Sequence, residues 1–280
     1  MTKIKLLRRF SELCLFIFLY VPLSVTAEET TEHNINSFEF NFGSFAPWQE
    51  NEGNVKGGYS HVKDPSGESD VLVELFTIKP GQCAAGDCNN NSSRWEKVEN
   101  VYDYPTNGSR AQPSEAWYGW EMFLPDEFAY GRQQAKGPIL MGQFKENNGR
   151  GCPHLALWHY TRGNDAYDLV IQKNLDGPPP NDCKAMYSRP LSQIKPMLGK
   201  WSRVELRVKW SLGNDGEIDA FFNSRQVIKY RGPTCYVNCD EFNNFRYGVY
   251  FANQREKETR PVTVAYRNVK RANSRELLWQ

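Results

Sequence analysis

The stretch Trp201–Ser211, which reads WSRVELRVKWS, decides the fold class of this chain. Apolar and charged residues alternate one by one along most of it. The apolar members are Val204, Leu206, Val208 and Trp210, and the charged members are Arg203, Glu205, Arg207 and Lys209. Successive side chains of a β-strand point to opposite faces, so this period of two predicts a strand with one face in a core and the other in water.

The same pattern recurs along much of the chain. Other period-two or apolar runs are found at Phe38–Phe42, Val71–Ile78, Trp117–Leu124, Ile139–Phe144, Ala166–Gln172, Glu217–Asn223, Phe245–Phe251 and Val262–Val269. Helical periodicity is nearly absent, and the connections are rich in Gly, Pro, Asn and Asp, which favour turns. Many strands without a break in composition predict an all-β fold, a jelly-roll sandwich of two antiparallel sheets with a concave groove for a ligand.

The N-terminal end of the chain has the pattern of a secretory signal peptide. Four basic residues precede an apolar run from Leu13 to Val21, and the small residue Ala27 follows. A membrane anchor would need about 20 unbroken apolar residues, whereas Glu12 and Pro22 bracket a much shorter run. We therefore expect cleavage and export.

The composition is that of a folded domain, with 40% hydrophobic, 24% charged and 14% aromatic residues among 280. We expect residues 1–27 to be the signal peptide, residues 28–34 a flexible leader, and residues 35–280 a single domain. Of the 34 Lys and Arg residues four lie in the signal peptide, and of the 33 Asp and Glu residues one does, which leaves 30 basic against 32 acidic residues. Without a basic excess we expect no nucleic-acid partner. Because the signal peptide is removed, we expect a secreted or periplasmic protein that does not associate with a membrane. We also expect a monomer.

Cysteine usage agrees with export, because six cysteines remain after the signal peptide and lie in close pairs or short loops. On proximity we predict the disulfides Cys83–Cys88, Cys152–Cys183 and Cys235–Cys239, although six cysteines allow about 15 pairings. The alternative is a zinc site, but the spacings lack paired C-x-x-C knuckles, and an oxidising compartment favours disulfides.

Four short motifs occur in order along the chain. They are SRWE at Ser93–Glu96, AWYGWEMFLPD at Ala116–Asp126, ILMGQFK at Ile139–Lys145 and FRYGVY at Phe245–Tyr250. This ordered set resembles the jelly-roll polysaccharide lyases, especially the group related to heparin lyase I and glucuronan lyase, and more distantly the alginate lyases. In that superfamily an R-x-E strand, a Q-x-H or Q-x-K strand and a K-x-G-x-Y strand lie side by side on the concave sheet. The resemblance spans roughly Phe38 to Arg271 and implies that residues 35–280 form a lyase domain.

The resemblance implies an enzyme that cleaves a uronic-acid polysaccharide by β-elimination, such as glucuronan, a heparin- or heparan-like chain, or alginate. A base removes the proton at C5, next to the carboxylate, and the oxygen at C4 leaves with a proton. Cations or N–H donors must neutralise the carboxylate, because its charge destabilises the developing carbanion. The catalytic residues implied are Arg94, Gln143, Lys145 and Tyr250. No cofactor is required, and a structural calcium ion stays an open alternative.

Each of these residue types suits one part of the reaction. The guanidinium of Arg94 and the amide of Gln143 can both bind a carboxylate. Tyr250 stands at the position of the family's catalytic tyrosine and would move the proton. Its pKa, ordinarily about 10, would be lowered by Lys145 and Arg246. Lys145 stands where alginate lyases and heparin lyase I have a histidine, so we expect it to bind or neutralise the carboxylate rather than to act as the base.

A second set of residues is expected to bind substrate: Arg246, Glu96, Trp95, Tyr247 and His154. Arg246 replaces the family's lysine and would tune Tyr250 or hold a neighbouring uronate. The two aromatic residues would stack on sugar rings or complete the core. His154 and His159 are both expected to be structural, and His154 is the reserve candidate for the base if it projects into the groove. No metal site is expected, because no third ligand accompanies these histidines at a useful spacing.

Two other function classes stay open. A non-catalytic, lectin-like jelly roll would keep the groove without turnover, and the missing histidine favours it. A laminarinase-type glycoside hydrolase would need an E-x-D-x-x-E strand, of which Glu217-Ile218-Asp219 supplies only the first part. Without the resemblance, Arg94 and Glu96 would be interpreted as an ion pair on a solvated face.

Overall fold

The computed structural model describes residues 45–47, 58–79, 81–83, 86–89, 91–99, 115–128, 138–146, 151–159, 165–174, 183–236, 243–251 and 261–280. All of them belong to one compact unit, Asn34–Gln280. The predicted signal peptide, the leader, the strand at Phe38–Phe42 and the half-cystine Cys239 lie outside the described residues, so these predictions stay predictions.

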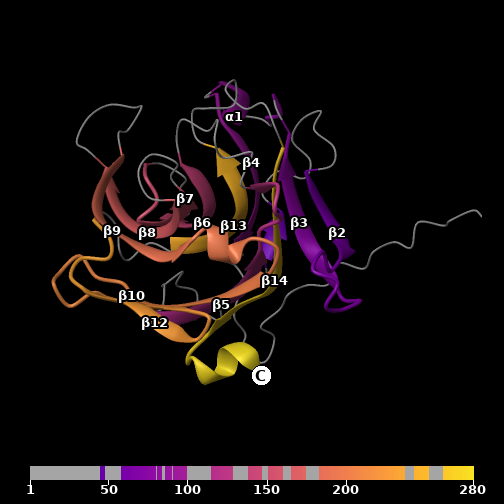
Figure 1. The fold of residues 1–280 in the computed structure, drawn as a ribbon. Coiled ribbons are helices and arrows are strands. Elements are labelled where there is room, and N and C mark those ends of the chain that lie inside the picture. Colours follow the sequence, from indigo (N-terminus) through magenta and orange to yellow (C-terminus); the bar gives the residue numbers. More distant parts are fainter. Residues whose placement is uncertain are drawn as a thin grey trace, which may run out of the picture. The chain divides into compact units, whose positions relative to one another are not determined.

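The described strands form two antiparallel sheets of seven strands each (Figure 1). The first sheet has the order β1 (Phe45–Pro47), β4 (Ser93–Glu99), β13 (Asn243–Phe251), β6 (Ile139–Glu146), β7 (Leu155–His159), β8 (Ala166–Asn174) and β9 (Cys183–Gln193). The second sheet has the order β12 (Arg225–Arg231), β11 (Glu217–Phe222), β10 (Trp201–Lys209), β5 (Glu115–Phe123), β14 (Val262–Ala272), β3 (Leu72–Ile78) and β2 (Tyr59–Lys63). The helical segments described are short: α1 (Gly86–Asn89) and the 3-10 turns Lys195–Met197 and Glu276–Trp279. This architecture confirms the predicted jelly-roll sandwich.

The alternation along β10 gives the buried pattern that it predicts except at Glu205, which is fully buried and accepts hydrogen bonds from Arg203 and Arg275. Val204, Leu206 and Val208 are fully buried, and Arg203 and Arg207 are only half-buried. Every other predicted run within the described residues overlaps a strand of the structure.

The predicted runs leave out two interior strands, β4 and β7, and the edge strands β1, β2, β9 and β12. Of the edge strands, β2, β9 and β12 have described side chains. Most residues of β9 and β12 are exposed, and β2 has no fully buried residue. Edge strands that face water on both sides need no apolar stripe, so the sequence does not mark them.

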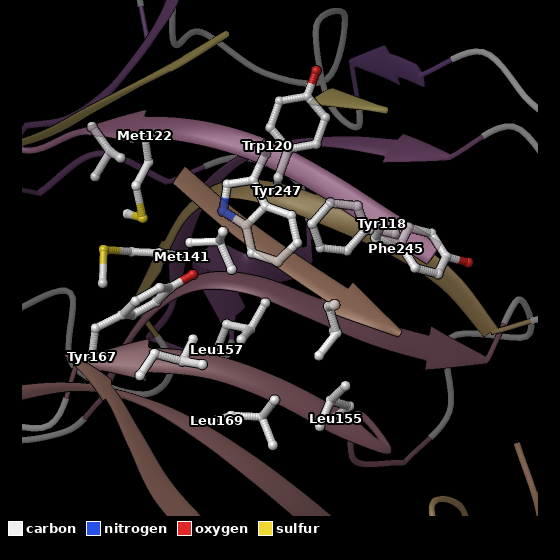
Figure 2. Packing of buried hydrophobic residues seen from close by; sticks show 14 of the residues in the cluster. Tyr118, Trp120, Met122, Met141, Leu155, Leu157, Tyr167, Leu169, Phe245 and Tyr247 are labelled. Carbon is white, nitrogen blue, oxygen red and sulfur yellow. The ribbon is translucent and has the colours of Figure 1, made fainter. Parts of the chain in front are cut away.

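The core lies between the two sheets and is dominated by aromatic rings (Figure 2). Tyr118 and Trp120 from β5 pack on Phe245 from β13, with ring centroids 5.5 Å and 5.1 Å apart. Phe144 from β6 stacks on the same Phe245 at 4.8 Å. Because Phe245 faces the core, the neighbouring even-numbered residues of β13 must face away from it.

Buried ion pairs connect the two sheets through this core. Lys97 of β4 contacts Glu74 of β3 at 2.5 Å, and the hydroxyl of Tyr247 donates to the same carboxylate at 2.7 Å. Arg271 of β14 contacts Glu99 of β4 at 3.0 Å. Burial raises the pKa of Glu99, although Arg271 acts to lower it. Charges removed from water remain ionised only with such partners, so these pairs fix how the sheets meet.

The predicted disulfides Cys83–Cys88 and Cys152–Cys183 are both present, with Cα atoms 5.1 Å and 5.6 Å apart. Cys235 is also disulfide-bonded. Among the described helices, none has the length and apolar character needed to cross a membrane.

Candidate active site

Three adjacent strands of the first sheet carry the residues implied by the resemblance. Strand β13 lies between β4 and β6, and the register places Arg94 opposite Tyr250 and Gln143 opposite Arg246. All four therefore share the face of the sheet that is turned away from the core. We call this the outer face of the first sheet. The guanidinium, the amide and the phenol, far apart in sequence, are brought together there.

Arg94 is the most highly connected residue of this face. Its Nε and Nη2 donate to the two carboxylate oxygens of Asp87 at 2.6 Å and 2.7 Å, and its Nη1 donates to Glu96 at 3.4 Å. Its guanidinium carbon lies 4.0 Å from the ring centroid of Tyr250. Burial by itself would lower the pKa of Arg94, but the hydrogen bonds to Asp87 and the charge of Glu96 raise it. Arg94 is therefore a permanent cation beside the phenol.

The side chain of Glu96 lies among the residues of the site and is only 1% exposed. Its Oε1 accepts a hydrogen bond from Nε2 of Gln143 at 2.6 Å. This bond uses one of the two N–H donors of the amide and fixes the orientation of Gln143. The carboxylate of Glu96 thus contacts both Arg94 and Gln143, and its expected contact with substrate stays a prediction.

The expected role of Arg246 requires correction, because its residue is only 1% exposed. Its Nε donates to Oδ1 of Asn244 at 3.0 Å. Burial lowers the pKa of Arg246 to about 10, although Glu96 opposes the change. A guanidinium buried to this degree does not present its charge to a neighbouring uronate. It instead adds a positive charge beneath Glu96 and Tyr250.

The phenol of Tyr250 is half-buried and has a raised pKa. Burial is the largest cause, and Arg94 together with a hydrogen bond to the Ser92 side chain act in the opposite direction. The expectation that Lys145 and Arg246 would lower this pKa is therefore wrong, because desolvation of the phenolate outweighs the nearby cation. Tyr250 is a protonated phenol at neutral pH.

The backbone of β13 requires a glycine at position 248, two residues before Tyr250. Its φ of +138° lies in a region that other residues avoid. A Cβ at this position would lie 2.1 Å from the carbonyl oxygen of Trp95 on β4. The pairing of β13 with β6 also shifts register between Tyr247 and Tyr250. The glycine allows β13 to approach β4 closely while the strand changes register, and Tyr250 follows directly after this irregularity.

Trp95 and Tyr247 lie on the opposite face from the site. Both belong to the core between the sheets, and the hydroxyl of Tyr247 is held by Glu74. Of the two alternatives expected for them, contact with sugar rings or a place in the core, the structure agrees with the core. Alternation requires this result, because each of them is adjacent in sequence to a residue of the outer face.

The remaining predicted residues lie further along the same sheet. Lys145 is half-buried and lies two residues after Gln143 on β6, so alternation places it on the outer face. His154 is buried just before β7, where its backbone N–H donates to the carbonyl oxygen of Phe144 at 2.9 Å. His159 is fully buried, with Nδ1 3.0 Å from the carbonyl oxygen of Ala166. The structural role expected for His159 is confirmed.

The carboxylates of the hydrolase alternative lie on the second sheet, in β11. Glu217 and Asp219 both accept hydrogen bonds from Nη1 of Arg207, at 2.7 Å and 2.8 Å. Their charges are thus used in an ion-pair network on the second sheet, whereas Arg94, Gln143 and Tyr250 lie on the first sheet. The arrangement gives no support to glycoside hydrolysis by this strand.

Sequence reasoning missed three residues of the site: Asp87, Ser92 and Asn244. Asn244 could have been found, because it lies two residues before Arg246 and so shares its face. No local pattern marks Asp87, which reaches Arg94 from helix α1. Within the part of the chain that the structure describes, no group of three His, Cys, Asp or Glu side chains could hold a metal ion.

With this geometry described, comparison with known proteins identifies the family. The fold is that of a jelly-roll protein with two antiparallel sheets. A family model for polysaccharide lyases matches residues 40–269, and the chain belongs to that family. It is therefore a polysaccharide lyase, as the motifs predict.

A solved lyase structure has a similar fold. The endo-β-1,4-glucuronan lyase from the fungus Trichoderma reesei is 20% identical, with a TM-score of 0.57 over 79% of this chain and 89% of that chain. A family 7 alginate lyase in complex with substrate is 14% identical, with a TM-score of 0.49 over 79% of this chain and 84% of that chain. The alginate lyase from Klebsiella pneumoniae is 13% identical, with a TM-score of 0.48 over 79% and 87%. Among the curated protein sequences none matches significantly.

Proposed function

We propose that the protein is a secreted or periplasmic enzyme that cleaves a uronic-acid-containing polysaccharide by β-elimination. The substrate would be glucuronan, a heparin- or heparan-like chain, or an alginate-like chain. The observation that carries this proposal is the contact of Arg94 with the ring of Tyr250 at 4.0 Å, on the same face as the Gln143 amide that Glu96 orients. The disulfides support export, because they persist in oxidising compartments.

The substrate carboxylate must be neutralised while a carbanion develops next to it. Gln143 can donate an amide N–H to it, and Lys145 can supply a positive charge from the same strand. Arg94 keeps N–H groups beyond those that bind Asp87 and Glu96, because a guanidinium carries five donors. These three groups would bind the acidic sugar with its C5 proton and O4 near Tyr250.

The raised pKa of Tyr250 decides which proton transfer it performs most readily at neutral pH. A protonated phenol can donate its proton to the leaving oxygen at C4, and a separate base, for which His154 is the reserve candidate, must then take the C5 proton. As a base it must first ionise, and ionisation increases as pH rises toward the raised pKa. If Tyr250 is the base, kcat/KM will therefore rise with pH through the alkaline range, whereas a purely acidic role makes the rate fall there.

The test is to incubate the protein with glucuronan, alginate, heparin, heparan sulfate and pectin and to follow the ultraviolet absorbance of the unsaturated product. We expect one of these polymers to be cleaved. Tyr250→Phe should reduce kcat by at least about a hundredfold, in line with the contribution of general acid–base catalysis, while substrate binding is retained. Tyr187→Phe is the matched control, because Tyr187 lies on the edge strand β9 of the same sheet and should leave the rate unchanged.

Binding without cleavage of any polyuronate would contradict the proposal and favour a lectin-like module. The elimination proposed needs no cofactor, so treatment with a chelator should leave the rate unchanged. A loss of both rate and thermal stability on chelation, restored by calcium, would instead support the structural calcium ion.

A further inference from the structure

Helix α1 contributes a carboxylate that no motif contains. Asp87 accepts two hydrogen bonds from Arg94, at 2.6 Å and 2.7 Å, and its side chain is only 6% exposed. Two parallel bonds from a guanidinium to a carboxylate fix the plane and direction of the guanidinium, which a single bond does not. Arg94 would otherwise be a long side chain with several available rotamers.

The segment that carries Asp87 is closed by a disulfide and is hydrogen-bonded to Ser92, the residue before β4. The Cys83–Cys88 disulfide closes the loop around helix α1, with its Cα atoms 5.1 Å apart. The backbone carbonyl of Asp87 accepts a hydrogen bond from the N–H of Ser92 at 2.9 Å. The side chain of Ser92 in turn hydrogen-bonds Tyr250. Asp87 is thus held in place by a covalent bond beside it and by its own backbone.

Asp87, Arg94 and Tyr250 form one continuous chain of contacts, ending in the stack of guanidinium on phenol at 4.0 Å. We propose that Asp87 is a positioning residue: it holds the Arg94 guanidinium against the ring of Tyr250, and the Cys83–Cys88 disulfide holds Asp87 in place. The proposal deepens the proposed function and, for its kinetic part, rests on it.

The charged groups that face Tyr250 come from three elements. Arg94 and Glu96 lie on β4, Asp87 on α1, and Arg246 on β13. Arg94 lowers the pKa of Tyr250, and Asp87 and Glu96 raise it. If Asp87 holds the guanidinium of Arg94 in position, the effect of Arg94 on the pKa of Tyr250 must depend on the residue at position 87.

A double-mutant cycle tests this dependence. The variants are Asp87→Asn, Arg94→Met and the combination, assayed on the polyuronate that the wild type cleaves. We expect Asp87→Asn to lower kcat by about tenfold to a hundredfold, the range produced by small displacements of reacting groups, with KM changed much less. The combined variant should be little slower than Arg94→Met alone, because both changes break the same chain of contacts. Multiplicative losses would overturn the proposal.

A second readout does not require activity. Tyrosinate absorbance during an alkaline titration, measured as the difference between each protein and its Tyr250→Phe counterpart, reports the pKa of Tyr250 alone. Arg94→Met should raise this pKa clearly in the wild-type background and less in the Asp87→Asn background. An equal rise in both backgrounds refutes the positioning role. If no polyuronate is cleaved, the proposed function fails while this titration still decides the role of Asp87.

Control variants separate positioning from general damage. Asp87→Glu keeps the charge and should recover part of kcat, and Asp70→Asn removes a carboxylate whose side chain is 98% exposed and should change nothing. The pair Cys83→Ser and Cys88→Ser should reproduce the effect of Asp87→Asn and add little to it. The same loss from Cys152→Ser with Cys183→Ser, at equal thermal stability, would contradict a specific role for the loop disulfide.

Discussion

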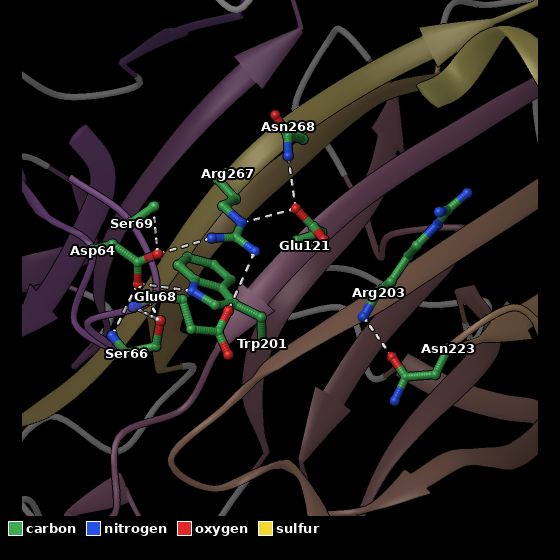
Figure 3. Close-up of polar contacts among 10 residues, drawn as sticks. All are labelled: Asp64, Ser66, Glu68, Ser69, Glu121, Trp201, Arg203, Asn223, Arg267 and Asn268. Carbon is green, nitrogen blue, oxygen red and sulfur yellow. Dashed lines mark hydrogen bonds and ion pairs between the residues drawn. The ribbon is translucent and has the colours of Figure 1, made fainter. Parts of the chain in front are cut away.

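Replacing Asp64 by Asn should destabilise the protein by about 2 kcal/mol at neutral pH, and the difference should vanish in acid. Asp64 lies in the turn after β2, where its carboxylate collects five hydrogen bonds (Figure 3). Oδ1 accepts from the N–H and hydroxyl of Ser66, at 2.9 Å and 2.6 Å, and from Nε1 of Trp201 at 2.9 Å. Oδ2 accepts from the hydroxyl of Ser69 at 2.8 Å and from Nη1 of Arg267 at 2.9 Å.

The magnitude follows from the ionisation of this carboxyl group. Burial alone would raise the pKa of Asp64, but the hydrogen bonds from Ser66, Trp201 and Ser69 lower it from 3.8 to about 2. One pKa unit corresponds to about 1.4 kcal/mol, so the ionised carboxylate stabilises the fold by about 2 kcal/mol. Because the folded pKa is the lower one, this stabilisation is present above pH 3.8 and is lost as pH falls toward about 2.

The assay is denaturant unfolding followed by tryptophan fluorescence, at neutral pH and at about pH 2. At neutral pH the melting temperature of Asp64→Asn should also fall by roughly 4–8 °C, as expected for a domain of this size. Asp70→Asn is the control, because Asp70 lies in the same turn but is exposed. An equal loss of stability at both pH values would refute the reasoning, since the difference would then not come from the charge of Asp64.

Two further predictions concern the interior. Gly248→Ala should destabilise the protein by at least about 3 kcal/mol, because its Cβ would lie 2.1 Å from the carbonyl oxygen of Trp95. The control Gly67→Ala also has a positive φ but nothing within 4 Å, so thermal denaturation should show a clearly smaller loss. Arg271→Met should cost about 3–5 kcal/mol by leaving the buried carboxylate of Glu99 without its cation. Adding Glu99→Gln to Arg271→Met should recover part of the lost stability, as measured by denaturant unfolding. A further loss of stability in the double variant would show that other groups stabilise the charge of Glu99.

Alternation along the strands could have shown which candidate residues face the core, and the list of candidates did not take this into account. Arg94 and Glu96 are two residues apart and share a face, so Trp95 between them had to face the core. The same argument assigns Tyr247 to the core, because Arg246 precedes it on the outer face. The alternative of sugar contact stayed open for these two residues because the motifs were considered as continuous strings rather than as two interleaved faces.

Other features could not be inferred from local pattern at all. Helix α1 is four residues long and has no periodicity, and its carboxylate reaches Arg94 only because the chain folds back against β4. The direction in which the pKa of Tyr250 moves depends on burial, which outweighs the cation beside it. The burial of Arg246 likewise changes a presumed substrate ligand into an internal charge.

The resemblance of the motifs to a known family implied which residues meet on one sheet. The sequence by itself determined the strands with a buried face, the sandwich architecture and the close disulfide pairs. It could do so because side-chain alternation and short loop closure are local properties of the chain. Only the tertiary structure decided which polar residues are covered, which carboxylate holds Arg94, and whether the phenol of Tyr250 is ionised. Those outcomes depend on desolvation and on contacts between segments distant in sequence, and neither is encoded in the order of neighbouring residues.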